Sequence, residues 1–345
     1  MKNLIFICCI LIILFKTGNV LSDNNIFNVN NVEISKEIST NKEKLANQAF
    51  KKGFKELINR LLLEEDYKKI STTNLDQIKR LISYYQIKNK EKEENNNIRF
   101  NIFFDKDKIH NFFYQKNILY SDIINTDMII FPLLISDKQY FIYTKNYFYE
   151  NWNKESSKDL IKYTLPAENI ESIQKIKINR ENIYQINIED FFKEYNLENM
   201  AFVTIKINQN IAKVFLNTKI ADKKLNKNLL ITNPGLNQKQ FNNRIISEIK
   251  NVIRDLIKSQ NLIDVRIPSF LNAEIKLNNK SNLVEFNNRL KKIDLIDSFY
   301  VQELNKDYVL VKIKYLGKIN KIIKKLKDQN IDLNMRKGQW QLNII

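Results

Sequence analysis

Two adjacent rows of apolar residues make residues 42–62 the clearest predicted helix in the chain. The two rows are Leu45, Ala49, Gly53, Leu57 and Leu61, and Ala46, Phe50, Phe54, Ile58 and Leu62. Neighbouring rows at this spacing form a wide apolar stripe, so we expect the helix to be buried along one side. Thr40 and Glu43 predict a capping box at its start. Gly53 within the stripe favours close approach of another element, because glycine inside a helix otherwise costs stability.

The pattern around this helix predicts a small unit of mixed helices and strands. Strands are expected at 26–36, 83–90 and 97–104, where apolar and polar residues alternate. A short helix is expected over 75–82. Asp105 should cap a further helix, whose apolar face is formed by Ile109, Phe112 and Phe113.

A near-continuous apolar run at 127–136 begins a second unit and is typical of a strand buried on both faces. Further strands are expected near 200–207, 211–220 and 227–232, and a short helix over 188–195. The pattern between 155 and 185 is too weak to predict elements. A long helix over 238–260 carries an apolar row that begins at Phe241 and would cover a small sheet.

The last part of the chain predicts the order β-α-β-β-α-β of a ferredoxin-like split sandwich. The expected elements are a strand over 265–277, a helix from Ser281, strands near 295–304 and 309–315, a helix over 319–326, and a final strand with Trp340, Leu342 and Ile344.

The predicted fold is therefore α+β and multi-domain, with small mixed sheets that carry helices on one face. Roughly 320 residues remain after the N-terminal segment discussed next, and that exceeds the size at which one core keeps growing. We expect an N-terminal α+β domain over 23–122, a middle α/β domain over 123–262 and a C-terminal ferredoxin-like domain over 263–345.

The first residues have the three parts of a secretory signal peptide, about residues 1–22. Lys2 precedes an apolar run from Leu4 to Phe15, and Val20 and Ser22 occupy the −3 and −1 positions of a cleavage site before Asp23. The run is shorter than a membrane-spanning helix needs. An uncleaved anchor or a buried core helix is the alternative. The prediction is export to the periplasm.

Cleavage would change the chemistry open to the mature chain. It removes both cysteines, Cys8 and Cys9, and with them any disulfide or thiolate site. It also removes Lys2 and Lys16 and no acid, so the net charge falls from +17 to +15. Lysines are dispersed among acids in a chain rich in Lys, Asn and Ile, as AT-rich genomes encode. We therefore expect no nucleic-acid partner, but weak attraction to anionic polymers or lipid head groups.

The sequence predicts no catalytic, cofactor-binding or metal-ligating residue. His110 is the only histidine and has no histidine or cysteine partner at ligand spacing, so we interpret it as a structural residue at the margin of a buried helix face. A general base or a metal ligand is the alternative. The five glycines form no phosphate-binding motif. The acid pairs Glu64–Glu65 and Glu189–Asp190 are interpreted as surface charge, although a hydrolase can use such carboxyl groups.

Three further segments have two interpretations each. The aromatic block from Tyr140 to Trp152 is interpreted as core, with a sugar- or peptide-binding platform as the alternative. The lysine-rich segment 318–327 is interpreted as an ordinary helix with a solvated face, rather than a membrane-surface helix. The sequon Asn279-Lys280-Ser281 would matter only in a eukaryotic secretory pathway.

Several segments resemble the bacterial family called domain of unknown function 2066. They are ANQAFKKGFKELINRLL, FNIFFDKDKIHNFF, MIIFPLLI followed by Trp152, and the tail YLGKINKIIKKLKDQNIDLNMRKGQWQL. The sequence LLLEED departs from the family, whose first helix often continues into Ser-Gly. Residues 125–262 are similar in layout to the N-terminal domain of the periplasmic translocation protein TolB, but no propeller follows. The resemblances imply a Gram-negative periplasmic protein without assigned catalytic residues.

These observations favour a non-enzymatic cell-envelope interaction or assembly factor. Its partner would be another envelope protein or an anionic envelope polymer, and exposed sheet edges would suit strand addition. The alternative is a carboxylate-dependent hydrolase that acts on cell-wall or polysaccharide material. The sequence indicates no cofactor and no oligomeric state.

The signal peptide gives a direct prediction about the mature protein. When the full chain is exported in a Gram-negative host, the recovered protein should begin at Asp23, as measured by intact-mass spectrometry. Ser22→Ala should be processed normally, whereas Ser22→Phe should accumulate uncleaved, because the −1 position requires a small residue. A wild-type protein that retains residues 1–22 would contradict the prediction.

Overall fold

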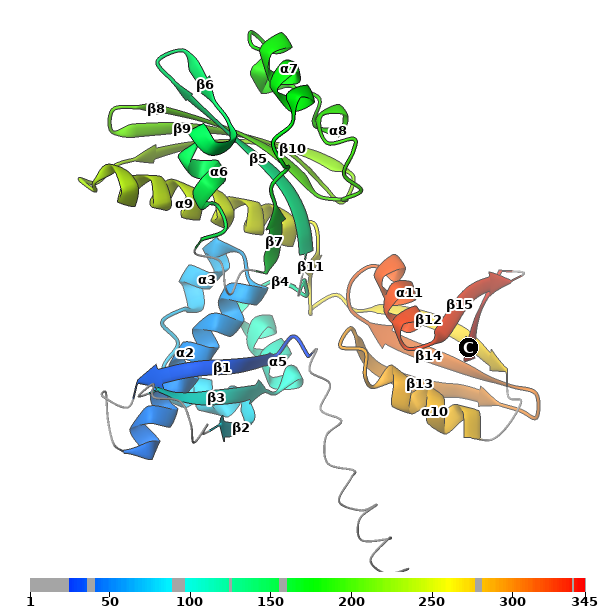
Figure 1. Cartoon of the computed structure of the whole chain (residues 1–345). Coiled ribbons are helices and arrows are strands. Elements are labelled where there is room, and N and C mark those ends of the chain that lie inside the picture. Colours follow the sequence, from blue (N-terminus) through cyan, green and yellow to red (C-terminus); the bar gives the residue numbers. More distant parts are fainter. Residues whose placement is uncertain are drawn as a thin grey trace, which may run out of the picture.

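The computed structural model describes residues 25–35, 41–88, 97–123, 126–154, 160–276, 281–336 and 338–344. The predicted signal segment, with its two cysteines, lies outside these ranges. The described chain forms three sheets and one short strand pair, and the predicted α+β class is confirmed (Figure 1).

The first sheet has the order β1-β3-β2 and packs against the long helix α2. Its elements are β1 (Asn28–Ser35), α2 (Lys42–Leu61), α3 (Glu64–Ile70), α4 (Leu75–Leu81), β2 (Ile82–Lys88), β3 (Asn97–Phe104) and α5 (Lys106–Lys116). All ten residues of the two predicted apolar rows are buried. Asp105 caps α5 as expected, accepting hydrogen bonds from the backbone N–H groups of Asp107 and Lys108.

The start of α2 differs from the expectation by one residue. The side chain of Asn41 accepts a hydrogen bond from the backbone N–H of Glu43 at 2.8 Å, so Asn41 is the N-cap. Thr40 of the predicted capping box lies outside the described residues. Helix α3 was not predicted, because only Ile70 of its residues is buried and it therefore shows no apolar stripe.

The middle sheet has the order β10-β9-β8-β5-β6, and β7 also pairs with β5. Its strands are β5 (Thr126–Ser136), β6 (Gln139–Phe141), β7 (Ile161–Thr164), β8 (Met200–Asn208), β9 (Ile211–Ile220) and β10 (Lys223–Thr232). Its helices are α6 (Tyr147–Asn151), α7 (Ile170–Ile178), α8 (Ile188–Phe191) and α9 (Gln238–Ser259), with the 3-10 turns η2 (Tyr143–Lys145) and η3 (Ile183–Gln185).

This sheet carries helices on both faces, whereas we expected them on one. Figure 1 shows α9 below the sheet and α7 and α8 above it. The cause is the predicted double burial of β5. Met128 and Ile130 pack in the core on the α9 side, while Ile129 and Phe131 pack in a separate core beneath α7 and α8. Because alternate residues of a strand point to opposite faces, both faces of β5 need cover.

The last sheet has the order β13-β14-β12-β16-β15. Its elements are β12 (Ser269–Lys276), α10 (Ser281–Leu290), β13 (Ile296–Leu304), β14 (Tyr308–Tyr315), α11 (Ile319–Asp328), β15 (Ile331–Arg336) and β16 (Gln339–Ile344). The predicted β-α-β-β-α-β order is present, with β15 as an unpredicted addition before the final strand. Because β15 takes the edge, β16 returns next to β12 and pairs with it in parallel.

A short strand pair joins the three sheets. The chain leaves the first sheet through β4 (Tyr120–Ser121) and leaves the middle sheet through β11 (Leu262–Ile263), and these two strands pair antiparallel (Figure 1). Buried side chains from both ends of the described chain, between Ile26 and Tyr120 and between Ile263 and Leu342, form one continuous cluster. The predicted domain boundaries near 122 and 262 lie beside this strand pair.

Polar contacts reinforce the junction. Lys258, near the end of α9, is 3% exposed, and its Nζ donates to the carbonyl oxygens of Asn59 at 2.7 Å and Leu62 at 2.5 Å. The carboxylate of Asp255 accepts from the backbone N–H of Glu64 at 3.2 Å. One turn of α9 therefore supplies hydrogen-bond partners for carbonyl groups at the end of α2 and for an N–H group at the start of α3. Backbone groups at helix ends lack partners within their own helices.

The packing of Gly53 yields a test of the first unit. A Cβ atom at this position would lie 2.5 Å from Cδ1 of Ile102 on β3, which confirms the predicted close approach. Ile102 is fully buried, so it has no free space into which its Cδ1 atom could turn away. Gly53→Ala should therefore lower the free energy of unfolding, because overpacking costs ~1–3 kcal/mol and the gain in helix propensity is ~1 kcal/mol.

Ile102→Val removes that Cδ1 atom, so in this background Gly53→Ala should become stabilising. Urea unfolding of the four chains measures this change of sign. If Gly53→Ala changes the free energy of unfolding equally in both backgrounds, the clash with Ile102 is not the cause.

Candidate interaction surface

Strand β10 forms an open edge of the middle sheet. It pairs with β9 over its whole length, from Lys223 opposite Ile220 to Thr232 opposite Ile211. No strand in the described part of the chain pairs with its other side. An edge strand of this length presents backbone N–H and C=O groups to which another chain can bond.

A groove of about 390 Å³ lies beside this edge. It is lined by Tyr184, Lys213, Val214, Phe215, Asn228, Leu229 and Leu230. Leu230 is 66% exposed, and the half-exposed ring of Tyr184 packs edge-on against Phe215 at a centroid distance of 5.5 Å. We call this strand edge and its groove the β10 surface.

The groove exists because the helical cover of this face is incomplete. The core beneath α7 and α8 takes its sheet residues from β5 and β8, and none from β9 or β10. Tyr184, in η3, marks the end of this cover. Beyond it the sheet face carries Phe215 and Leu230 with no helix above them, so apolar groups remain in contact with solvent.

The β10 surface is strongly basic. Residues 200–232 contain six lysines and a single acid, Asp222. Lys206 and Lys213 stand opposite each other on the groove side of β8 and β9, and both are exposed. Like charges directly opposite each other disfavour the isolated sheet and favour an acidic ligand.

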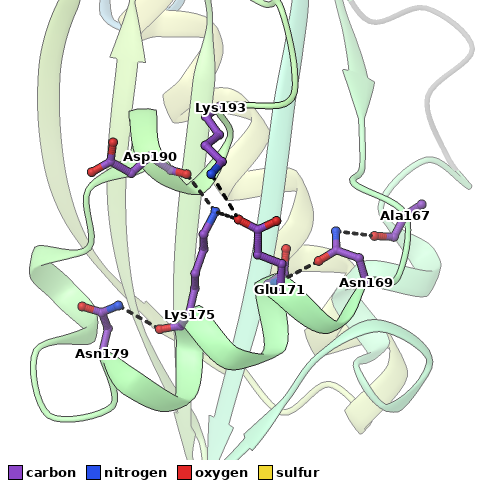
Figure 2. Close-up of polar contacts among 8 residues, drawn as sticks. Ala167, Asn169, Glu171, Lys175, Asn179, Asp190 and Lys193 are labelled. Carbon is purple, nitrogen blue, oxygen red and sulfur yellow. Dashed lines mark hydrogen bonds and ion pairs between the residues drawn. The ribbon is translucent and has the colours of Figure 1, made fainter.

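Polar contacts fix the wall that contains α7 and α8 (Figure 2). Glu171 lies 2.8 Å from Nζ of Lys175 and 3.5 Å from Nζ of Lys193, and the same Lys175 donates to the carbonyl oxygen of Asp190 at 2.9 Å. The hydrogen bond and charge of Lys175 hold the pKa of the Glu171 carboxyl below its usual value. Asn169 caps α7. These contacts tie α7 to α8 and so hold the segment that carries Tyr184.

The predicted acid pairs take part in surface ion pairs. Glu189 lies 3.2 Å from Lys224 and 3.7 Å from Lys219, while Asp190 accepts a hydrogen bond from the Asn187 side chain. Glu64 and Glu65 pair along α3 with Lys68 and Lys69. None of these four acids lines the groove beside β10 or the cavity between α6 and α9.

Two carboxyl groups have a pKa raised by burial, Asp255 and Asp294. Asp255 is bonded to the start of α3, and Asp294 accepts from the backbone of Ile26 at the start of the first unit. Nearby, Asp122 forms an ion pair with Lys321 of α11. Asp255 therefore lies at a different contact of the junction from Asp294. The charge of Asp122 adds to the effect of burial on the pKa of Asp294, and Asp122 itself is held by Lys321.

His110 lies on the buried side of α5, 9% exposed. Its Nε2 is 3.1 Å from the hydroxyl of Tyr120, and its ring packs edge-on against Phe27 at 5.4 Å. Burial, and then the charge of Lys106, lower the pKa of the imidazole to about 4, against the opposing effect of Asp297. The histidine is thus neutral at ordinary pH and packs where the first unit meets the last.

Two of the three remaining segments with two interpretations pack against the core. The aromatic block divides between the two faces of the middle sheet, with Tyr143 on the α7 side and Phe148 and Trp152 on the α9 side. Ile322 and Leu326 bury one face of α11, so the lysine-rich segment packs as an ordinary helix. Asn279 and Lys280 of the sequon lie outside the described residues.

The β10 surface was not predicted. The pattern indicated a strand only over 227–232, because the first half of β10 is polar and exposed. The sequence did contain one indication, because residues 200–232 hold six lysines and only one acid, but the high lysine content of the whole chain concealed it.

Within the described ranges, no group of three or more histidine, cysteine, aspartate or glutamate residues could hold a metal ion. No helix in the described part of the chain is long and apolar enough to cross a membrane. No protein-family model, no curated protein and no solved structure matches this chain.

The buried His110 predicts a pH dependence of stability. Its pKa is about 4 in the folded chain and near 6.5 when unfolded, so the unfolded chain binds the proton first as the pH falls. The contribution to stability is complete above pH 6.5 and is lost progressively towards pH 4, by up to ~3 kcal/mol.

His110→Phe should reduce the fall in the free energy of unfolding between pH 6.5 and 4, measured by urea unfolding. This change of slope is expected whether or not the substitution alters stability at pH 7. Lys116→Gln at the exposed end of α5 serves as the control and should keep the wild-type slope. A wild-type slope in His110→Phe would contradict the prediction.

Proposed function

We propose that this chain is an exported, non-enzymatic interaction factor of the bacterial cell envelope that binds a partner protein by strand addition at the β10 surface. The observation that carries the proposal is the open, ten-residue edge of β10 with an apolar groove along it. Strand addition obtains affinity from main-chain hydrogen bonds and specificity from pockets that receive alternate side chains. The edge and the groove supply these two components.

The charge of the surface defines the partner segment. An added strand would place one set of alternate side chains over the groove beside Phe215 and Leu230, where apolar residues gain most. The other set of alternate side chains would point to the opposite face of the sheet. Lys223 and Lys227 of β10 lie on that face, opposite Ile220 and Leu216, so acidic residues at these positions would meet them. The partner segment is therefore extended, acidic and apolar at alternate positions.

Two further considerations support this role over the alternatives. An anionic polysaccharide would use the lysines but not the main-chain groups of the edge, so the combination favours a protein. A carboxylate-dependent hydrolase works with two carboxyl groups on either side of the scissile bond. The acids with raised pKa, Asp255 and Asp294, instead bond to separate backbone segments at the junction. The predicted signal segment supports the proposed periplasmic location.

The test uses a synthetic ten-residue peptide in which valine and glutamate alternate. We expect it to bind the full mature chain and to protect β10 backbone amides from hydrogen exchange, because an added strand bonds to them. The same peptide with lysine in place of glutamate should not bind. Leu230→Lys should weaken binding about tenfold or more, because it removes the apolar floor of the groove.

Ile267→Lys is the matched control, since Ile267 is also exposed, at 71%, but lies beside the last sheet. It should leave the affinity unchanged. Protection outside β10, or equal affinity in the two variants, would refute the proposal. Binding of an anionic polysaccharide that Leu230→Lys does not weaken, without peptide binding, would favour a polymer partner instead.

A further inference from the structure

A small polar cavity lies on the other side of the middle sheet, between α6 and α9. Its volume is about 100 Å³. It is lined by Asn151, Trp152, Asn243, Ile246, Ser247, Lys250, Asn251 and Arg254. Those on α9 recur every three or four positions, so they share one side of that helix. The β10 groove lies on the opposite face of the sheet, and the cavity is independent of it.

Trp152 supplies a hydrogen-bond donor without an acceptor. Its side chain is fully buried, and its indole Nε1 has no hydrogen-bond partner. A buried N–H that lacks an acceptor costs free energy, and such groups are rare unless a bound molecule completes them. Since Trp152 is part of the cavity wall, an acceptor bound in the cavity would satisfy it.

The charge of the wall favours an anion over a neutral acceptor. Among the described lining residues, Lys250 and Arg254 are cationic and none is acidic. Lys250 is 7% exposed, and its Nζ lies 5.3 Å above the ring of Tyr163. Arg254 is oriented by Asn251, whose side-chain oxygen accepts from its Nη1 at 3.1 Å. Lys250 is buried and Arg254 is half-buried, and a charge-assisted hydrogen bond to an anion stabilises a cation most where water is excluded.

We infer that this cavity is a binding site for a phosphate-type oxyanion. Lysine, arginine, serine hydroxyl and indole N–H are all donors, and together they suit an ion that accepts in several directions. A carboxylate offers acceptors in one plane only, whereas the donors here come from two helices on either side of the cavity. Inorganic phosphate and a small phosphate ester share this chemistry.

Tryptophan fluorescence gives a local readout. The chain has two tryptophans, so the Trp340→Phe variant leaves Trp152 as the single fluorophore. Titration with inorganic phosphate at constant ionic strength should give a saturable change in its emission, while sodium chloride should not. A parallel titration with glycerol 3-phosphate distinguishes the free ion from a phosphate ester. A saturable response to either compound supports the site and identifies which form it accepts.

Lys250→Met, made in the Trp340→Phe background, should weaken the affinity about tenfold or more. Ser247→Ala should weaken it by a smaller factor, and its exposed position keeps the test valid if Lys250→Met does not fold. Lys239→Met, an exposed lysine at the start of the same helix, is the control and should bind as the parent does. No saturable response to either phosphate compound, or unchanged affinity in both lining variants, would overturn the inference.

Discussion

The pairing of β4 with β11 is the contact on which the arrangement of the three sheets depends. Both strands are only two residues long, so their own hydrogen bonds are few. The strand pair is stabilised instead by the buried residues around it. Tyr120 of β4 is fully buried beside His110, and Lys258 at the end of α9 donates to the last carbonyl groups of α2. Burial lowers the pKa of Lys258 to about 8, a cost that the two carbonyl acceptors offset in part.

Elements with a complete apolar pattern were predictable, and those that depend on their neighbours were not. Helices α2 and α9 bury continuous rows, so their sequences identify them without tertiary information. Strand β15 was missed because only Ile331 and Leu333 are buried before it runs into solvent. Helix α7 was missed because two of its isoleucines, Ile170 and Ile178, are exposed and obscure the helical pattern.

The two candidate sites were harder to predict from the sequence than the helices and strands. The groove beside β10 depends on where the cover by α7, η3 and α8 ends, which is a property of packing and not of β10 itself. The small cavity brings Trp152 from one helix end to Lys250 on another. In the sequence, Trp152 is one member of an aromatic block interpreted as core. The block does pack in the core, and only the position of one indole nitrogen distinguishes Trp152 from its neighbours.

The antiparallel pair of β4 and β11 also shows that the middle sheet is an insertion between the first and last parts of the chain. The polypeptide enters the middle sheet after residue 122 and returns beside its point of departure at residue 262, while the parts before and after share one hydrophobic cluster. A module inserted in this way can be gained or lost without breaking the host core, since its two ends are adjacent. The host would be a two-sheet protein, in which a short turn from Ser121 to Leu262 replaces the module that carries both the β10 surface and the oxyanion cavity.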